Sequence, residues 1–160
     1  MRQFINGFDQ RFLRLVQHSR DLLGMISNEM LFVRPRELAR TFTPFSCGEY
    51  ILRSAAMVEK TFGGITTRLW DDPFEWTLPE TLSTTQDVLG YLAEVEATRN
   101  AGFGFFVSDD DMKREIPSPE KLRSLFDILL ETLAHAEHFQ GRAFAVFQML
   151  SDEKLPRIEV

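Results

Sequence analysis

The chain has 160 residues, a single cysteine and a formal net charge of −6, which is typical of one acidic domain covering residues 1–160. Its 44% hydrophobic residues and fifteen phenylalanines supply a core, and the lone cysteine excludes an internal disulfide and a thiolate-rich zinc site. The acidic balance argues against nucleic acid, and no apolar run reaches the eighteen or so residues of a membrane span, so we expect a cytoplasmic protein with neither as partner.

The first predicted helix covers Arg2–Ile26. Its apolar residues recur at steps of three, four and seven, which places them on one helical face: Phe4, Phe8, Phe12, Leu15, Leu22 and Ile26. Ser27 and Asn28 are expected to end this helix. The segment Phe32–Pro44 contains two prolines and is expected to be an irregular connection.

The second predicted helix has the clearest pattern in the chain. Ser46 and Glu49 form a capping-box signature, and apolar residues then alternate by four and three as far as Leu69. The pair Gly63–Gly64 lowers helix propensity, and we interpret it as a kink or a close helix crossing. The loop that follows is expected to run from Trp70 to Pro79.

Two further helices complete the prediction. Ser83 and Gln86 indicate a capping box at the start of the third helix, which is expected to extend to about Phe106. An acidic loop follows, and Ser118–Pro119–Glu120 then predicts the start of a fourth helix that reaches about Ser151. No segment shows sustained alternation of period two, so the predicted fold class is all-α, with four main helices and long loops.

Histidine is scarce, which narrows the chemistry that the chain could perform. The histidines are His18, His135 and His138, and there is no nucleophile elbow, Walker A motif or dinucleotide fingerprint. His135 and His138 are three residues apart and could share a metal ion, but catalytic zinc usually takes three protein ligands. We expect His135 to be an interior side chain and His138 to lie at the surface.

The stretch His135-Ala-Glu-His-Phe-Gln-Gly-Arg142 resembles the last-helix signature of DinB/YfiT-like proteins, H-x-x-H-H-x-G-Q. In that family the first and fifth residues of the signature are metal ligands. The matching positions here are His135 and Phe139. On the pattern of the helix, Phe139 is expected to be a core aromatic residue, and its replacement by alanine is expected to cost about 3–5 kcal/mol.

The third ligand of that family is a histidine early in the second helix, in a pattern like S-x-G-E-x-x-x-H-x-x-x-x-E. The stretch from Ser46 to Glu59 resembles this pattern. Counting from Ser46 places the ligand position at Arg53, whereas counting back from Glu59 places it at Ser54. The helical wheel favours Ser54, and neither position holds a histidine.

The resemblance covers nearly the whole chain and implies a DinB-like four-helix bundle that is often dimeric. It also implies relatives that bind a divalent metal ion, that act in some branches as thiol-dependent transferases or isomerases, and that are associated with DNA-damage-inducible genes. Two of the three ligand positions lack a histidine here. We therefore expect a homodimeric DinB-like protein with a degenerate metal site and no cofactor, which serves as a non-catalytic binding or stress-related accessory protein.

The alternative is a metal-dependent thiol transferase or isomerase that uses a small-molecule thiol. It would hold one divalent ion (Zn, Ni or Fe) through unconventional ligands, for which the weak candidates are Glu131, His135 and His138. Glu131 and His135 are four residues apart and share a helical face. Carboxylate bundles, however, use a Glu-x-x-His spacing of three, which this pair does not match.

Five residues near the family's ligand positions are candidates for a pocket: Cys47, Glu49, Arg53, Ser54 and Arg142. An inward-facing Arg53 would supply a fixed positive charge where the metal ion stands in the family, either in a structural ion pair or toward a substrate anion. Cys47 lies at a predicted helix N-terminus, where it is either an activated thiol or a packed one.

Overall fold

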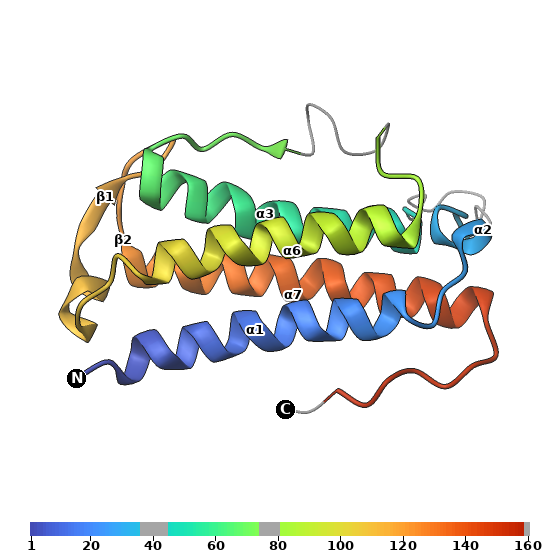
Figure 1. The fold of residues 1–160 in the computed structure, drawn as a ribbon. Helices are drawn as coiled ribbons and strands as arrows, with labels where there is room; N and C mark the ends of the chain where they lie inside the picture. The colour runs from blue at the N-terminus through green and yellow to red at the C-terminus, as the bar shows by residue number, and fades with distance from the viewer. Residues whose placement is uncertain (36–44, 74–80, 159–160) are drawn as a thin grey trace, which may run out of the picture.

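The computed structural model describes residues 1–35, 45–73 and 81–158, and these form a bundle of long helices that lie side by side (Figure 1). The four long helices in this part of the chain are α1 (Gln3–Leu23), α3 (Cys47–Thr67), α6 (Thr85–Phe103) and α7 (Leu125–Leu150). The predicted all-α four-helix class is therefore confirmed. At the other end of the bundle from the hairpin described below, a short helix α2 (Asn28–Leu31) follows α1.

A small feature that the sequence did not predict lies between α6 and α7. It consists of a 3-10 turn, η1 (Asp109–Lys113), and an antiparallel hairpin of β1 (Glu115–Pro117) and β2 (Leu122–Ser124). The prediction that Ser118–Pro119–Glu120 starts the fourth helix is wrong. Both the amide and the hydroxyl of Ser118 donate to the carbonyl of Lys121, at 2.9 and 2.6 Å, so these residues form the hairpin turn.

The same residue types suit a turn and a helix start, which explains this error. Proline at the second position of a β-turn has the φ that the turn requires, as it does in the first turn of a helix. The helix α7 starts at Leu125 instead. The hydroxyl of Ser124 accepts a hydrogen bond from the amide of Asp127 at 3.2 Å and thereby caps it.

The capping box of the second predicted helix is confirmed. The Ser46 hydroxyl accepts from the amide of Glu49 at 3.2 Å, and the Glu49 carboxylate accepts from the amide of Ser46 at 2.8 Å. The third helix begins one residue later than predicted, because its capping box consists of Thr84 and Asp87. A carboxylate near a helix N-terminus interacts favourably with the helix dipole, which the neutral amide of Gln86 does not do.

The core between the helices is rich in phenylalanine. Phe62 of α3 is fully buried, and its ring lies 5.5 Å from that of Phe12 on α1 and 5.1 Å from that of Phe103 on α6. Aromatic pairs of this kind contribute roughly 0.5–1.5 kcal/mol beyond the burial of area. The predicted apolar face of the first helix is thus confirmed at Phe12, whereas Phe4 in the first turn is exposed.

Several predicted boundaries differ from the structure. The helix α1 ends at Leu23 rather than Ile26, and Ser27 precedes α2 instead of ending the first helix. Residues 32–35 of the predicted irregular connection have no regular structure, and residues 36–44 lie outside the described part of the chain. In the predicted loop at 70–79, residues 74–79 likewise lie outside it.

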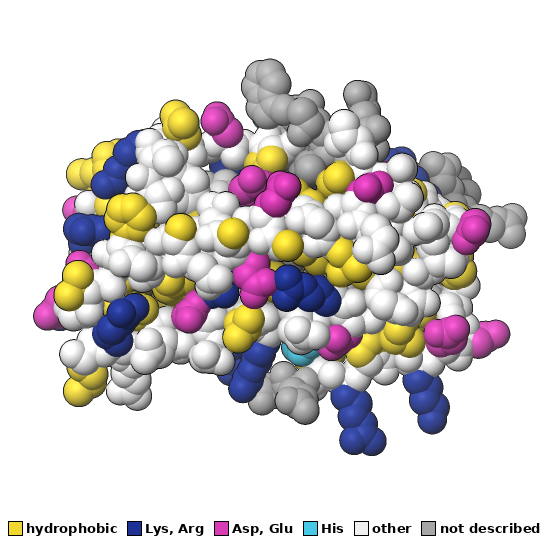
Figure 2. All heavy atoms as spheres, in the orientation of Figure 1, with side chains coloured by type: hydrophobic (Ala, Val, Ile, Leu, Met, Phe, Trp, Pro, Cys, Tyr) yellow, Lys and Arg dark blue, Asp and Glu magenta, His cyan; other side chains and the backbone are white. Residues whose placement is uncertain are grey.

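None of the described helices is both long and apolar enough to cross a membrane. Acidic and basic side chains are interspersed over the face drawn in Figure 2 rather than separated into patches of one sign. That face therefore lacks the continuous basic stripe that is the usual footprint of a nucleic-acid-binding protein.

Candidate functional site

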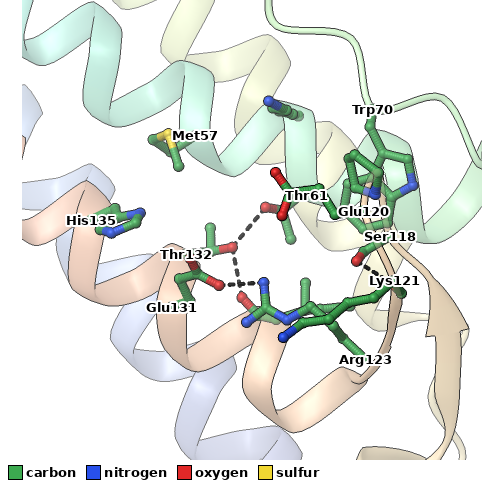
Figure 3. Close-up of a pocket in the computed structure, with 13 residues that line it drawn as sticks. Met57, Thr61, Trp70, Ser118, Glu120, Lys121, Arg123, Glu131, Thr132 and His135 are labelled. Atoms are coloured by element: carbon green, nitrogen blue, oxygen red, sulfur yellow. Dashed lines mark hydrogen bonds and ion pairs between the residues drawn. The ribbon is translucent and has the colours of Figure 1, made fainter.

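A groove of about 290 Å³ lies between α3 and α7, beside the β1–β2 hairpin (Figure 3). Ligand pockets usually have volumes of about 300–1,000 Å³, so this groove would accept a compact organic molecule. It is lined by Met57, Lys60 and Thr61 of α3, by Trp70, by Ser118, Pro119, Glu120, Lys121 and Arg123 of the hairpin, and by Ile128, Glu131, Thr132 and His135 of α7.

Two buried threonines join α3 and α7 at the groove. The hydroxyl oxygens of Thr61 and Thr132 lie 2.7 Å apart, and the Thr132 hydroxyl donates to the carbonyl of Ile128, also at 2.7 Å. Because the Thr132 proton is used in this way, Thr61 must be the donor between the two threonines. The pair therefore offers the groove only acceptor lone pairs.

Some charged side chains of the groove form an ion pair, and others have none among the described residues. Arg123 and Glu131 form an ion pair along the side of the groove (Figure 3). Lys121 and Glu120 are exposed on the hairpin turn, and Lys60 is half-buried. Within the part of the chain that the structure describes, Lys60 has neither an ion pair nor a hydrogen bond. Three cations and two carboxylates leave the groove with a net charge of +1, in a chain whose formal charge is −6.

Trp70 packs on α3 because Gly64 leaves room for it. A Cβ atom at Gly64 would approach the indole ring closer than the 3.0 Å that real Cβ atoms respect. The helix α3 continues without a break through Gly63–Gly64 to Thr67. The glycine pair was interpreted as a kink or a close helix crossing, whereas Gly64 allows the close approach of an indole ring.

The side chains at the family's ligand positions are engaged in other contacts or exposed. Ser54 is buried, and its hydroxyl donates to the carbonyl of Ala136 at 2.7 Å. The guanidinium of Arg53, the other register, lies 4.1 Å from the ring centroid of Phe45. His135 is exposed at the groove, so the prediction of an interior histidine is wrong: the neighbouring Ala136 is the residue that faces α3.

These residues do not fit a divalent metal ion. A serine hydroxyl that is already bonded to a carbonyl and a phenyl ring replace two imidazoles, which leaves His135 as the single family ligand. Among the described residues, no group of three or more His, Cys, Asp or Glu side chains is arranged to hold a metal ion. Glu131 and His135 both line the groove, but Glu131 is paired with Arg123, and the exposed His138 is not among the lining residues.

Phe139 is only half-buried, so the expectation of a core aromatic residue is wrong. Its ring stacks against that of Tyr50, with centroids 6.4 Å apart. Because much of the ring already contacts solvent, we now expect Phe139→Ala to lower the free energy of unfolding by roughly 1–2 kcal/mol instead of the larger cost of a core aromatic residue. Urea denaturation measures this difference, and a loss above about 3 kcal/mol would contradict it.

The five candidate pocket residues lie outside the groove. Cys47 is fully buried, and burial raises the pKa of its thiol to about 12, so it is not an activated thiol. Burial also opposes the ionisation of Glu49, but hydrogen bonds from Arg34 and Ser46 outweigh it and lower the pKa of this carboxyl group. Arg142 is exposed and lies 5.9 Å from the ring centroid of Tyr50.

Sequence reasoning did not identify most residues of the groove. The available signal was the pair Thr61 and Thr132, because each polar residue occupies a position at the spacing of an apolar stripe. Lys60 carried no such signal. The hairpin residues were assigned to a helix start.

Fold and groove together define an all-helical four-helix bundle with an open cavity between α3 and α7. No protein-family model matches the chain, and no curated protein matches it either. Among solved structures, the chain is similar to a DinB-like protein of Bacillus subtilis, YjoA, with a TM-score of 0.71 and 18% sequence identity over 96% of this chain and 98% of that one. The chain therefore has the DinB-like fold, as the sequence resemblance implied.

Proposed function

We propose that this protein is a DinB-like bundle that acts without a metal cofactor, as a non-catalytic binding or accessory protein. The observation that supports the proposal best is the state of Ser54, which occupies the position of a family ligand. Its hydroxyl is buried and bonded to the carbonyl of Ala136 on α7. A metal ion at this place would have to break that bond and would gain a poor ligand in return.

The isolation of His135 also supports a protein without a metal cofactor. His135 is the one family histidine, and metal ions held by proteins normally need further ligands close to the first. We expect the protein to be a cytoplasmic homodimer, with a mass in solution twice the 18.5 kDa of one chain. The proposal also includes a role in a stress response, and the support for this role is the resemblance to the family.

Elemental analysis by mass spectrometry tests the proposal directly. Purified, untagged protein is exposed to zinc, nickel and iron, and loosely held ions are then removed. We expect background metal content in the wild type and in His135→Ala alike, because one exposed imidazole does not hold an ion tightly. The variant His18→Ala, which changes a histidine on α1, controls for adventitious binding to imidazole.

One outcome would contradict the proposal. About one tightly held ion per chain in the wild type and in His18→Ala, lost in His135→Ala, would show that the groove holds a metal. That result would favour the alternative of a metal-dependent thiol transferase or isomerase, with Glu131 as the next residue to replace.

A further inference from the structure

We propose that the groove between α3 and α7 binds a small aromatic carboxylate, with the carboxylate at Lys60 and the ring against Trp70. This inference rests on the proposed function, because it names the class of ligand that the non-catalytic bundle would take. Three observations carry it. Lys60 is half-buried and has no ion pair or hydrogen bond among the described residues. One wall of the groove is apolar and includes the indole of Trp70, and its floor is formed by the hydroxyl groups of Thr61 and Thr132, which have no free proton to donate.

The unengaged cation is Lys60. Arg123, a hairpin cation that also lines the groove, is already paired with Glu131, and Lys121 is exposed on the hairpin turn. Lys60 is half-buried in the groove and has no ionic or hydrogen-bonding partner among the residues that the structure describes. An ammonium group at the edge of a groove without an acceptor from the protein is a ready site for an anion.

The apolar wall consists of Trp70 together with Met57 and Ile128, which also line the groove. An indole face provides a flat surface on which an aromatic ring can stack, and Gly64 lets this indole lie close to α3. A thioether such as that of Met57 adapts to the outline of a ring. In Figure 3, Met57 and Trp70 lie on the α3 side of the cavity, opposite Glu131 and Arg123.

The floor determines where the anion must lie. The hydroxyl protons of Thr61 and Thr132 are both used within the bundle, so the floor presents lone pairs and repels an anion. The anionic group is therefore expected at the rim, next to Lys60, with the ring inward. Of the two lysines that line the groove, Lys60 is half-buried and Lys121 is exposed. One half-buried positive charge favours a singly charged carboxylate over a phosphate, which commonly binds at an arginine fork or a helix N-terminus.

A titration with cinnamate, followed by proton–nitrogen correlation spectra of the labelled protein, tests this inference. We expect shifts of the Trp70 indole N–H signal and of the amide signals of Thr61 and Thr132, with a Kd in the low millimolar range for so small a ligand. Cinnamamide has nearly the same shape but no charge. We expect it to bind roughly tenfold more weakly, because it cannot form the charge-assisted contact with Lys60.

Variants separate the role of Lys60 from a general effect of charge. Lys60→Met keeps the length and apolar character of the side chain, and we expect it to weaken cinnamate binding roughly tenfold while leaving cinnamamide unchanged. Lys154→Met removes a lysine from the C-terminal segment and should leave both ligands unaffected. Equal binding of cinnamate and cinnamamide to the wild type would overturn the proposal, and so would shifts confined to exposed apolar residues such as Phe105 and Val107.

The same titration is repeated after treatment with a chelator, so that the two proposals can fail separately. Unchanged binding in metal-free protein supports a groove that works without a cofactor. A metal ion found by elemental analysis would contradict the proposed function, yet the difference between wild type and Lys60→Met in metal-free protein would still decide whether the groove selects an anion.

Discussion

Replacing Arg99 with methionine is expected to lower the free energy of unfolding by about 2–3 kcal/mol. The side chain of Arg99 is only 4% exposed, and its guanidinium joins α6 to α1 through an ion pair with Asp9. Glu96, one turn away on α6, lies 3.8 Å from the same guanidinium and binds Arg20 of α1 at 2.6 Å. Loss of the guanidinium leaves the negative charges of Asp9 and Glu96 without one of their positive partners.

The magnitude follows from the exposure of the partners. Removing one member of a fully buried ion pair costs about 3–5 kcal/mol, because the other charge is left without water or partner. The Asp9 side chain is 38% exposed and would be partly rehydrated, which reduces the expected cost.

Urea denaturation of wild type and Arg99→Met, followed by circular dichroism, measures the change. Lys113→Met is the matched control, since Lys113 and Asp110 form an ion pair in which both side chains are more than 80% exposed. We expect this control to be indistinguishable from wild type. Equal stability of Arg99→Met and wild type would show that the ion pairs of Arg99 contribute no net stability.

Gly102→Ala is expected to destabilise the protein by roughly 1–3 kcal/mol, although alanine is the better helix former. A Cβ atom at position 102 would approach the ring of Phe62 closer than 3.0 Å. Phe62 cannot move away easily, because it is fully buried between Phe12 and Phe103. The added methyl group therefore forces a displacement in the centre of the core.

Gly90→Ala, a substitution in the same helix, is expected to stabilise the protein instead. Nothing lies within 4 Å of a Cβ atom at position 90, so the substitution is expected to stabilise the protein by about 0.5–1 kcal/mol through helix propensity alone. Thermal unfolding of the two variants side by side measures the difference in sign. Stabilisation by both substitutions would mean that Phe62 has room to relax.

Local signals in the sequence were enough to predict the long helices of the bundle, but not the contacts that residues distant in sequence make at the ends of those helices. The capping box of α3 and its seam as far as Ile65 were predicted correctly, because both depend on residues within a few positions of one another. The predicted last residue of the seam, Leu69, lies beyond the end of the helix at Thr67 and is exposed. The start of α1 was predicted to within one residue, but the cap of its first turn was not predicted. Its first turn is capped by Asp109, whose carboxylate accepts hydrogen bonds from the amides of Phe4 and Ile5 at 3.0 and 3.1 Å, across more than a hundred residues.

The candidate site was harder to predict than the fold. The positions of the family's ligands identified His135, which does line the groove, but they gave no information on Lys60, Trp70 or the hairpin. A groove is formed by residues that only the folded chain brings together. Thr61 and Thr132 are polar residues at positions where the helical pattern expects apolar ones. They are the part of the groove that periodicity alone could have revealed.

The small side chain at position 54 also determines whether a histidine could be accommodated there. Ser54 is 2% exposed, and its hydroxyl holds α3 against α7 at the carbonyl of Ala136. An imidazole there is larger than serine, and this space between the helices is already filled. Substituting histidine at positions 54 and 139 would therefore place imidazoles at both positions only if the two helices also moved apart, so a three-histidine site at this place would require a rearranged backbone in addition to the two substitutions.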